Sequence, residues 1–283
     1  MKMYDQYFSL PNFSYRLEKV TYYDYSSTKQ KLAQHIFGDD TKKLAVVIPG
    51  FSEHCAYVKK NIHHFLAQGY QVYCFDLPGH GLSSGEHYDI DHFQTYRLMF
   101  EAIIKLIPPQ KDCLFWCHST GAIGITSFLL DNPGDSHPFN KIILTAPLVR
   151  PYMWPLIKTL LFFLPFHSKI KRLERIVSPE YQQIKNTDPL IGQSIPVHWL
   201  KQFQIYWKKM KNLNTLSDEE ILVFISTQDK IVDSNCTYKF YNKHFPNVKK
   251  IELSGATHHP HLNSPEITQN YFSQIDQYLK ETL

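Results

Sequence analysis

Short apolar runs alternate with longer segments of helical spacing along most of the chain. The runs at 44–48, 72–75, 114–117, 142–145, 221–225 and 250–253 are mostly apolar and are bounded by turn residues or charges. Strands that are buried on both faces of a sheet have this pattern. Two weaker strands are predicted near the N-terminus, at 15–22 and 31–37.

Helices are predicted between these strands. The segments with helical spacing are 56–68, 91–107, 120–130, 234–244 and 265–279, and Pro108 and Pro109 end the second of them. Strands that alternate with helices are typical of a mostly parallel sheet flanked by helices on both faces. The sequence therefore predicts an α/β fold.

The alternation breaks off after Pro147 and resumes near residue 217. The segment between these points is rich in proline, contains no clear strand, and has several apolar or aromatic helical pieces. We therefore expect one α/β core that is interrupted by an inserted helical subdomain. The expected boundaries are 1–147 and 217–283 for the two parts of the core and 148–216 for the insertion.

Charge and cysteine usage narrow the class of protein. A net charge of +4 in 283 residues is too small to indicate a nucleic-acid partner. The segment 150–211, however, has a net charge of +8 and the remainder −4, which fits either a solvated face or a surface that meets an anionic partner. Five scattered cysteines predict free thiols, with Cys74, Cys113 and Cys117 buried in strands, and favour a reducing, cytoplasmic compartment. No secretory leader and no membrane-spanning run is visible.

Ser119 lies where a predicted strand passes directly into a predicted helix. It is the third residue of Cys117-His118-Ser119-Thr120-Gly121. A nucleophile elbow needs this context, because a sharp strand-to-helix turn exposes the serine hydroxyl and small neighbours let the strand and helix approach closely. The usual first glycine is Cys117 here, which is also small. The motif alone leaves open that Ser119 merely caps an ordinary helix.

Two further motifs follow strands. Residues 76–86 read Asp-Leu-Pro-Gly-His-Gly-Leu-Ser-Ser-Gly-Glu, and residues 47–54 read Val-Ile-Pro-Gly-Phe-Ser-Glu-His. The first is glycine-rich, but no phosphate-binding G-x-x-x-x-G-K-[ST] is present, which argues against nucleotide binding. In the second, a free backbone N–H after Gly50 would point toward the elbow.

In order and spacing, the three motifs resemble those of α/β-hydrolases of the monoacylglycerol lipase and lysophospholipase group. The resemblance covers about 43–131 and again 221 to the C-terminus, and 148–216 corresponds to the variable lid of these enzymes. It implies Ser119 as nucleophile, Asp229 as acid and His258 as base, with no cofactor. Asp233 is then expected to cap the next helix, and His259 is the alternative base.

The same resemblance implies a reaction mechanism. His258 would accept the proton of Ser119 while Asp229 holds the imidazole. Backbone N–H groups of Phe51 and Thr120 would bind the oxyanion. Pro49 and Ser52 depart from the family pattern of His and Gly in this loop, and because the donors are backbone groups, these residues matter only through the shape of the loop. Metal binding by His258-His259-Pro260-His261 or by His63-His64 is not favoured, because neither has ligand spacing typical of zinc sites.

The start of the insertion, 152–166, is strongly apolar and is followed by basic residues including Lys169, Lys171, Arg172 and Arg175. A helix packed on the core, an acyl-chain channel and a lid in peripheral contact with a membrane all fit this pattern. The leading hypothesis is a serine hydrolase that cleaves a lipid-like carboxylic ester. The alternatives are a peptidase or amidase, which needs a lid acid such as Glu174, Glu180 or Asp188, a C–C hydrolase, and a catalytically silent ligand-binding protein. Ser119 argues against epoxide hydrolases and dehalogenases, which use an aspartate nucleophile. The oligomeric state is left open.

Overall fold

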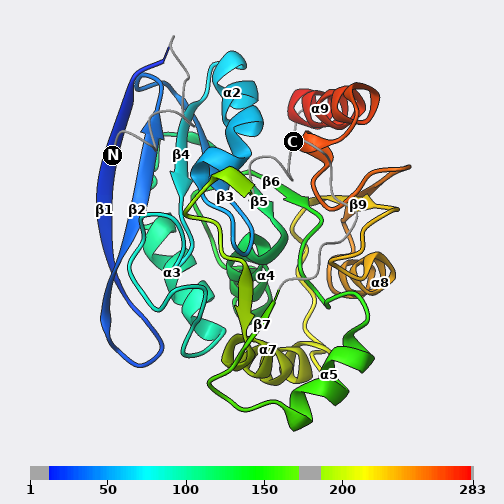
Figure 1. Ribbon diagram of the computed structural model, residues 1–283. Coiled ribbons are helices and arrows are strands. Elements are labelled where there is room, and N and C mark those ends of the chain that lie inside the picture. The colour runs from blue at the N-terminus through cyan, green and yellow to red at the C-terminus, as the bar shows by residue number, and fades with distance from the viewer. Residues whose placement is uncertain (1–12, 172–185, 282–283) are drawn as a thin grey trace.

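An eight-stranded sheet forms the centre of the molecule in the computed structural model, which describes residues 13–171 and 186–281 (Figure 1). The strand order across the sheet is β1-β2-β4-β3-β5-β6-β9-β10. β1 and β2 run antiparallel to each other, and β2 is antiparallel to β4. All other neighbours are parallel, as the alternation of strands and helices predicts. The strands are β1 (Tyr15–Tyr23), β2 (Lys29–Phe37), β3 (Lys43–Ile48), β4 (Gln71–Phe75), β5 (Asp112–His118), β6 (Lys141–Thr145), β9 (Leu222–Ser226) and β10 (Lys249–Leu253).

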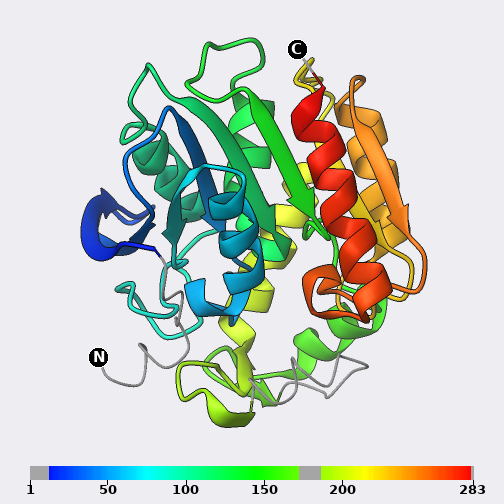
Figure 2. The same ribbon diagram turned by 90° about the horizontal axis from the view of Figure 1, so that it is seen from above.

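Helices cover both faces of the sheet (Figures 1 and 2). Alternate side chains of each strand point to opposite faces. In β3, Val46 and Ile48 therefore join one hydrophobic core, whereas Ala45 and Val47 join the other. The first core contains residues of α3 (Gln94–Ile104), α4 (Ala122–Asp131) and α8 (Ser234–His244), and the second contains residues of α2 (Lys59–Ala67) and α9 (Pro265–Lys280).

The insertion departs from the prediction in one respect. Its helices α5 (Trp154–Phe163) and α7 (Val197–Met210) are accompanied by a short antiparallel pair, β7 (Lys169–Lys171) and β8 (Ser194–Pro196). The expectation of no strand in this segment was therefore wrong. Three-residue strands of sequence Lys-Ile-Lys and Ser-Ile-Pro carry no recognisable alternation, and only their pairing identifies them. The boundaries drawn at 147/148 and 216/217 stay a prediction.

The two helices of the insertion differ in how they pack. Trp199 and Phe203 of α7 are buried in the first hydrophobic core. In α5 only Trp154 and Leu161 are buried, and Phe162 and Phe163 are 84% and 76% exposed. No helix among residues 13–171 and 186–281 combines the length and apolarity needed to cross a membrane.

The cysteines also require a correction. Cys55 and Cys74 form a disulfide, so the expectation of a free thiol at Cys74 was wrong, whereas Cys113 and Cys117 are free and buried as expected. Cys55 opens the short helix η1 (Cys55–Val58), which the fold brings against β4, with 6.0 Å between the two Cα atoms. The two cysteines are 19 residues apart in sequence, and this spacing does not indicate that they form a disulfide. The cysteine count therefore no longer supports a reducing compartment.

Candidate active site

The backbone makes a sharp turn at Ser119, between β5 and α4. Ser119 has φ +49°, a left-handed conformation that costs a non-glycine residue free energy and that persists where the surroundings enforce it. A short helix η2 (Ser119–Gly121) begins at this residue. A Cβ on Gly121 would lie 2.5 Å from the carbonyl oxygens of Ile48 and Pro49. Glycine is therefore needed at 121 for the helix to approach β3 this closely.

Ser119, His258 and Asp229 are connected by hydrogen bonds. The Ser119 Oγ is 3.0 Å from Nε2 of His258, and the opposite ring nitrogen, Nδ1, is 2.6 Å from Oδ2 of Asp229. All three side chains are buried. The structure thus brings the three residues selected from the sequence to one edge of the sheet, where β5, β9 and β10 end. His259, the alternative base, contacts Glu53 through Nε2 at 2.6 Å instead.

Asp229 is held as a carboxylate. Burial would raise its pKa, but the adjoining His258 and two backbone donors lower the pKa below its usual value. These donors are the N–H groups of Ile231 and Val232, which reach Oδ1 at 2.7 and 2.9 Å. Asp233, in contrast, accepts from the N–H of Cys236 and caps α8, as predicted.

The loop after β3 lies directly against the elbow. A Cβ on Gly50 would be 3.0 Å from the Cβ of Ser119. The next residue is Phe51, whose N–H has no acceptor within the described part of the chain. Thr120 lies in the first turn of a helix, where backbone N–H groups have no acceptor within the helix. The assignment of these two N–H groups to an oxyanion hole stays a prediction.

Sequence reasoning missed the role of Glu53. Its carboxylate lies fully buried behind the elbow, with Oε2 2.7 Å from the Gly50 nitrogen and 3.0 Å from Nδ1 of His118. Nε2 of His118 is in turn 3.0 Å from the carbonyl oxygen of His258. The motif placed Glu53 near the site, but its partners lie 65 and 206 residues away in sequence. Only the fold reveals them.

The glycine-rich segment after β4 begins with Asp76, which connects neighbouring loops through hydrogen bonds. Asp76 is buried, and its carboxylate accepts from the N–H groups of Cys55 and Leu82 at 2.8 and 2.9 Å. It is also 3.0 Å from Nε2 of His35 on β2. The Asp76 carboxylate thus holds the start of η1, the glycine-rich turn and β2 in fixed relation.

Ring nitrogens of His118, His258 and His259 lie within 4.8 Å of one another, a spacing at which three histidines could hold a metal ion. Hydrogen bonds already engage both nitrogens of His118 and of His258, and Nε2 of His259. A metal ion would have to displace Ser119, Asp229 or Glu53 from these nitrogens. The absence of a metal in the proposed chemistry stays a prediction.

The insertion packs over the loop after β3. The Phe51 ring lies 4.5 Å from the ring of Trp199 on α7, measured between centroids. His54 is buried and its Nε2 is 2.6 Å from Oδ2 of Asp188. Asp188 is one of the three lid acids considered for an amine-binding role. Glu174 and Glu180 lie outside the described residues.

The basic residues of the insertion are only partly paired. Arg150 forms an ion pair with Asp233, and Lys209 is 3.4 Å from Asp131. Lys169 and Lys171 are exposed on β7. Arg172 and Arg175 lie outside the described residues.

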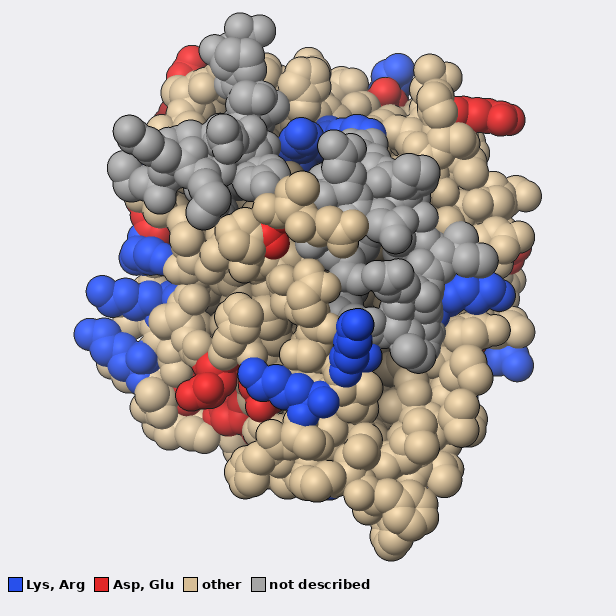
Figure 3. All heavy atoms as spheres, viewed as in Figure 1, with Lys and Arg blue, Asp and Glu red and all other residues tan. Residues whose placement is uncertain are grey.

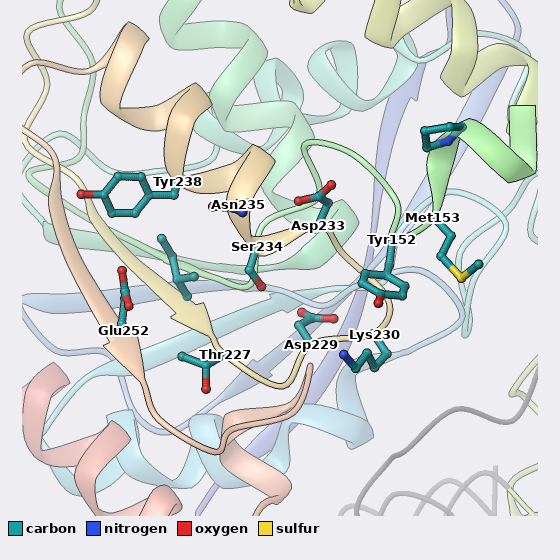
Figure 4. Close-up of a pocket in the computed structure, with 12 residues that line it drawn as sticks. Tyr152, Met153, Thr227, Asp229, Lys230, Asp233, Ser234, Asn235, Tyr238 and Glu252 are labelled. Atoms are coloured by element: carbon teal, nitrogen blue, oxygen red, sulfur yellow. The ribbon is translucent and has the colours of Figure 1, made fainter.

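A cavity of about 630 Å³ opens beside Asp229 (Figure 4). Figure 4 shows Asp229 next to Lys230 and Tyr152, with Glu252 and Tyr238 farther along the wall. Neither Ser119 nor His258 lines this cavity, so it is not the space in front of the nucleophile. Its lining residues are Tyr152, Met153, Pro155, Ile225, Thr227, Asp229, Lys230, Asp233, Ser234, Asn235, Tyr238 and Glu252.

Comparisons with known proteins identify the family of the chain. The family described as serine aminopeptidase, S33, matches residues 39–266. The chain is 25% identical to a monoglyceride lipase homolog of Monkeypox virus, covering 84% of this chain and 89% of the relative. It is 22% identical to a probable lysophospholipase L2 of Haemophilus influenzae, covering 84% of each.

Solved structures show the same fold. The chain superimposes on a Saccharomyces cerevisiae monoglyceride lipase with a TM-score of 0.76 at 16% identity, covering 94% of this chain and 96% of the other. For a Paleococcus ferrophilus monoacylglycerol lipase the TM-score is 0.71 at 19% identity, covering 88% and 98%. The chain therefore belongs to the serine aminopeptidase S33 family of α/β-hydrolases and resembles its monoglyceride lipases and lysophospholipases.

Proposed function

We propose that the protein is a serine hydrolase that cleaves the carboxylic ester of a lipid-like substrate, a monoacylglycerol or a lysophospholipid, through an acyl-enzyme on Ser119. The observation that carries the proposal is the continuous hydrogen-bonded series from Ser119 Oγ through His258 to Asp229. Each member of this series stands in the chain order and geometry that nucleophilic catalysis needs.

The reaction follows from these positions. His258 Nε2 takes the proton of Ser119 as the hydroxyl oxygen attacks the ester carbonyl, and later returns this proton to the leaving alcohol. Asp229 keeps the proton of His258 on Nδ1 and stabilises the imidazolium. The N–H groups of Phe51 and Thr120 bind the oxyanion. Water then attacks the acyl-enzyme while His258 accepts a proton from it. His258 returns this proton to the Ser119 oxygen, which frees the fatty acid and restores Ser119.

A lipid-like substrate is supported by the apolar surroundings and by the relatives. Phe51 and Trp199 pack together beside the elbow, and α5 exposes a row of apolar side chains at the outer end of the insertion. The names of the relatives, monoglyceride lipase and lysophospholipase, point in the same direction. We also propose that α5 makes the peripheral contact with a lipid surface.

A peptidase is the second candidate, because the matching family is described as serine aminopeptidase. Such an activity needs a carboxylate that is free to bind the substrate amine. Asp188 is buried against His54 and is therefore already paired. Within the described part of the insertion no free carboxylate therefore favours a peptidase, and ester hydrolysis is the better supported proposal.

The test replaces the nucleophile. Ser119→Ala should lose hydrolysis by at least about 10³-fold and should no longer be labelled by a fluorophosphonate probe. Ser127→Ala is the matched control, since Ser127 is a buried serine of α4 whose hydroxyl faces Tyr206. This control should keep both its ester hydrolysis and its labelling by the fluorophosphonate probe.

The substrate class is tested on the wild-type protein. Turnover is compared on glyceryl and p-nitrophenyl esters of rising chain length, on a lysophospholipid and on an aminoacyl amide. We expect kcat/KM to rise with acyl length and the amide to be poor. Faster cleavage of the amide would favour the peptidase, and continued labelling of Ser119→Ala would remove Ser119 from the nucleophile position.

A further inference from the structure

Four polar groups from three loops meet behind the nucleophile, namely the Gly50 N–H and the side chains of Glu53, His118 and His259. Glu53 is at their centre and is fully buried. Its Oε2 accepts from the Gly50 N–H at 2.7 Å and faces Nδ1 of His118 at 3.0 Å, and its Oε1 faces Nε2 of His259 at 2.6 Å. One carboxylate therefore contacts the loop after β3, the elbow and the loop of the proposed base.

The protons of His118 follow from its partners. Its Nε2 faces the carbonyl oxygen of His258 at 3.0 Å, and a carbonyl oxygen only accepts hydrogen bonds, so Nε2 carries a proton. Its Nδ1 faces Glu53, which is ionised: burial would raise the pKa of Glu53, but the adjoining His118 and His259 hold it well below its usual value. An ionised carboxylate also only accepts, so Nδ1 carries a proton as well.

The neighbouring histidines do not share this charge. Burial lowers the pKa of His259 to about 3 and that of His261 well below its usual value, so both rings are neutral at pH 7. Burial also acts to lower the pKa of His118, but Glu53, the His258 carbonyl and the charge of Asp229 together raise it. The ring of His118 also lies 4.8 Å from the ring of the proposed base His258, measured between centroids, and Trp116, which carries no charge, is stacked on it.

We propose that His118 is held as a doubly protonated imidazolium by Glu53 and the carbonyl of His258, and that Glu53 and His118 are positioning residues for the hydrolytic reaction. The pair fixes the loop of Gly50 and Phe51, the elbow and the backbone of the base relative to one another. It also places a permanent positive charge on the residue that precedes Ser119 in sequence.

The energetic reason lies in the burial of the pair. Two charges buried in contact interact strongly and cannot be separated without a large desolvation cost, so the geometry that they enforce is stiff. The kinetic part of this inference rests on the proposed function, whereas the charge of His118 does not.

The charge of His118 can be measured without any substrate. The full chain is labelled with ¹⁵N in its histidine rings, and ring nitrogen shifts are followed by NMR from pH 6 to 9, with His118→Gln used to assign the signal. We expect both nitrogens of His118 to be protonated at pH 8, where a histidine in a model peptide is neutral. A neutral His118 ring at pH 8 would overturn the proposal.

The positioning role is tested with Glu53→Gln, which keeps size and polarity but removes the charge. We expect kcat to fall by about ten- to a hundredfold, as for other partners that orient a reacting side chain, with KM within about threefold. Because Glu53 raises the pKa of His118, its loss should also move the alkaline limb of the kcat profile to lower pH. Asp276→Asn removes the partner of His64 in a half-buried pair between α2 and α9 and should change neither quantity.

The outcomes separate the two proposals. An equal loss of kcat at every pH in Glu53→Gln would reduce Glu53 to a structural role and contradict the inference. A wild-type protein that neither hydrolyses esters nor reacts with a fluorophosphonate would refute the proposed function, and the NMR measurement would still report the charge of His118. A doubly protonated His118 together with the shifted alkaline limb supports the inference.

Discussion

His80 shows how one buried ring makes stability depend on pH. Its Nδ1 donates to the Pro78 carbonyl at 2.7 Å, and its Nε2 has no partner among residues 13–171 and 186–281. Burial lowers the pKa of His80 to about 4, although the Pro78 carbonyl, Asp76 and Glu53 act in the opposite direction. The unfolded chain therefore binds a proton near pH 6.5 that the folded protein does not bind until about pH 4.

The sign follows from this difference. The stabilisation by neutral His80 is complete above about pH 6.5 and is lost as the pH falls toward 4, at up to about 1.4 kcal/mol per pH unit. His80→Gln should make the free energy of unfolding less dependent on pH in this window, as measured by urea denaturation at pH 7, 6 and 5. His63→Gln, at an exposed histidine, should keep the wild-type slope. An unchanged slope in His80→Gln would contradict the assignment.

Three residues of the candidate site were selected from sequence motifs and from their resemblance to those of a family. Ser119, Asp229 and His258 follow strands in a fixed chain order, so the motifs could select them before any contact was known. The cluster of Glu53 with His118 and His259 could not be selected in this way. It depends on hydrogen bonds across 65 and 206 residues, and a buried Glu has the same sequence signature as a solvated one.

Among the elements, the turn between β5 and α4 tolerates least change. Gly121→Ala would bring a Cβ to 2.5 Å from two backbone oxygens of the strand end at Ile48 and Pro49, a distance that backbone cannot accommodate without shifting. We expect this variant to displace the elbow, with activity lost by at least about a hundredfold and the free energy of unfolding lowered by about 2 kcal/mol or more. Ester turnover and urea denaturation measure the two effects.

Gly134→Ala separates packing from backbone strain. Gly134 has φ +82° but no atom within 4 Å of its missing Cβ, so this variant suffers only the conformational cost of about 1 kcal/mol. It should keep full activity. Similar losses in the two variants would show that the close approach of α4 to β3 is not what makes glycine necessary at 121.

The strands and helices of the core were predicted to within a few residues because each repeats one pattern. The run at 44–48 became β3 (Lys43–Ile48), and the helix at 234–244 became α8 with the same bounds. The exceptions are elements that only pairing defines. β7 and β8 are too short to show a period. The Cys55–Cys74 disulfide joins η1 to β4, and no local pattern in the sequence indicates that these two elements lie in contact.

At the scale of the whole molecule, α5 and the residue before it expose five large apolar side chains. In Figure 3 the lower end of the visible face, where Figure 1 places α5, is mostly tan, the colour of residues other than Lys, Arg, Asp and Glu. Met153, Leu156, Leu160, Phe162 and Phe163 are all about half exposed or more. Large apolar patches on a protein surface mark contact sites, and the exposed Lys158 on the same helix fits contact with a lipid surface.

The double variant Phe162→Ser, Phe163→Ser tests this contact. Each exposed phenylalanine that enters an apolar phase contributes on the order of 1.5 kcal/mol, about tenfold in affinity. We therefore expect turnover of a long-chain monoacylglycerol in mixed micelles to fall by about tenfold or more. Turnover of the soluble ester p-nitrophenyl butyrate, which needs no surface, should stay within about twofold. Tyr23→Ser, at a 59% exposed residue of β1, is the matched control and should change neither rate.

The comparison of the two substrates decides between the roles of α5 that the sequence left open. If α5 lined the acyl-chain channel, its phenylalanines would contact the acyl chain of every bound ester. The loss of turnover in the double variant would then grow with acyl length even for monomeric substrate. If α5 only stabilised the fold, both rates would fall together with the free energy of unfolding. A loss of turnover confined to aggregated substrate would identify contact with the lipid surface as the role of α5. Phe162 and Phe163 are 84% and 76% exposed in the folded protein, so their replacement removes little internal packing.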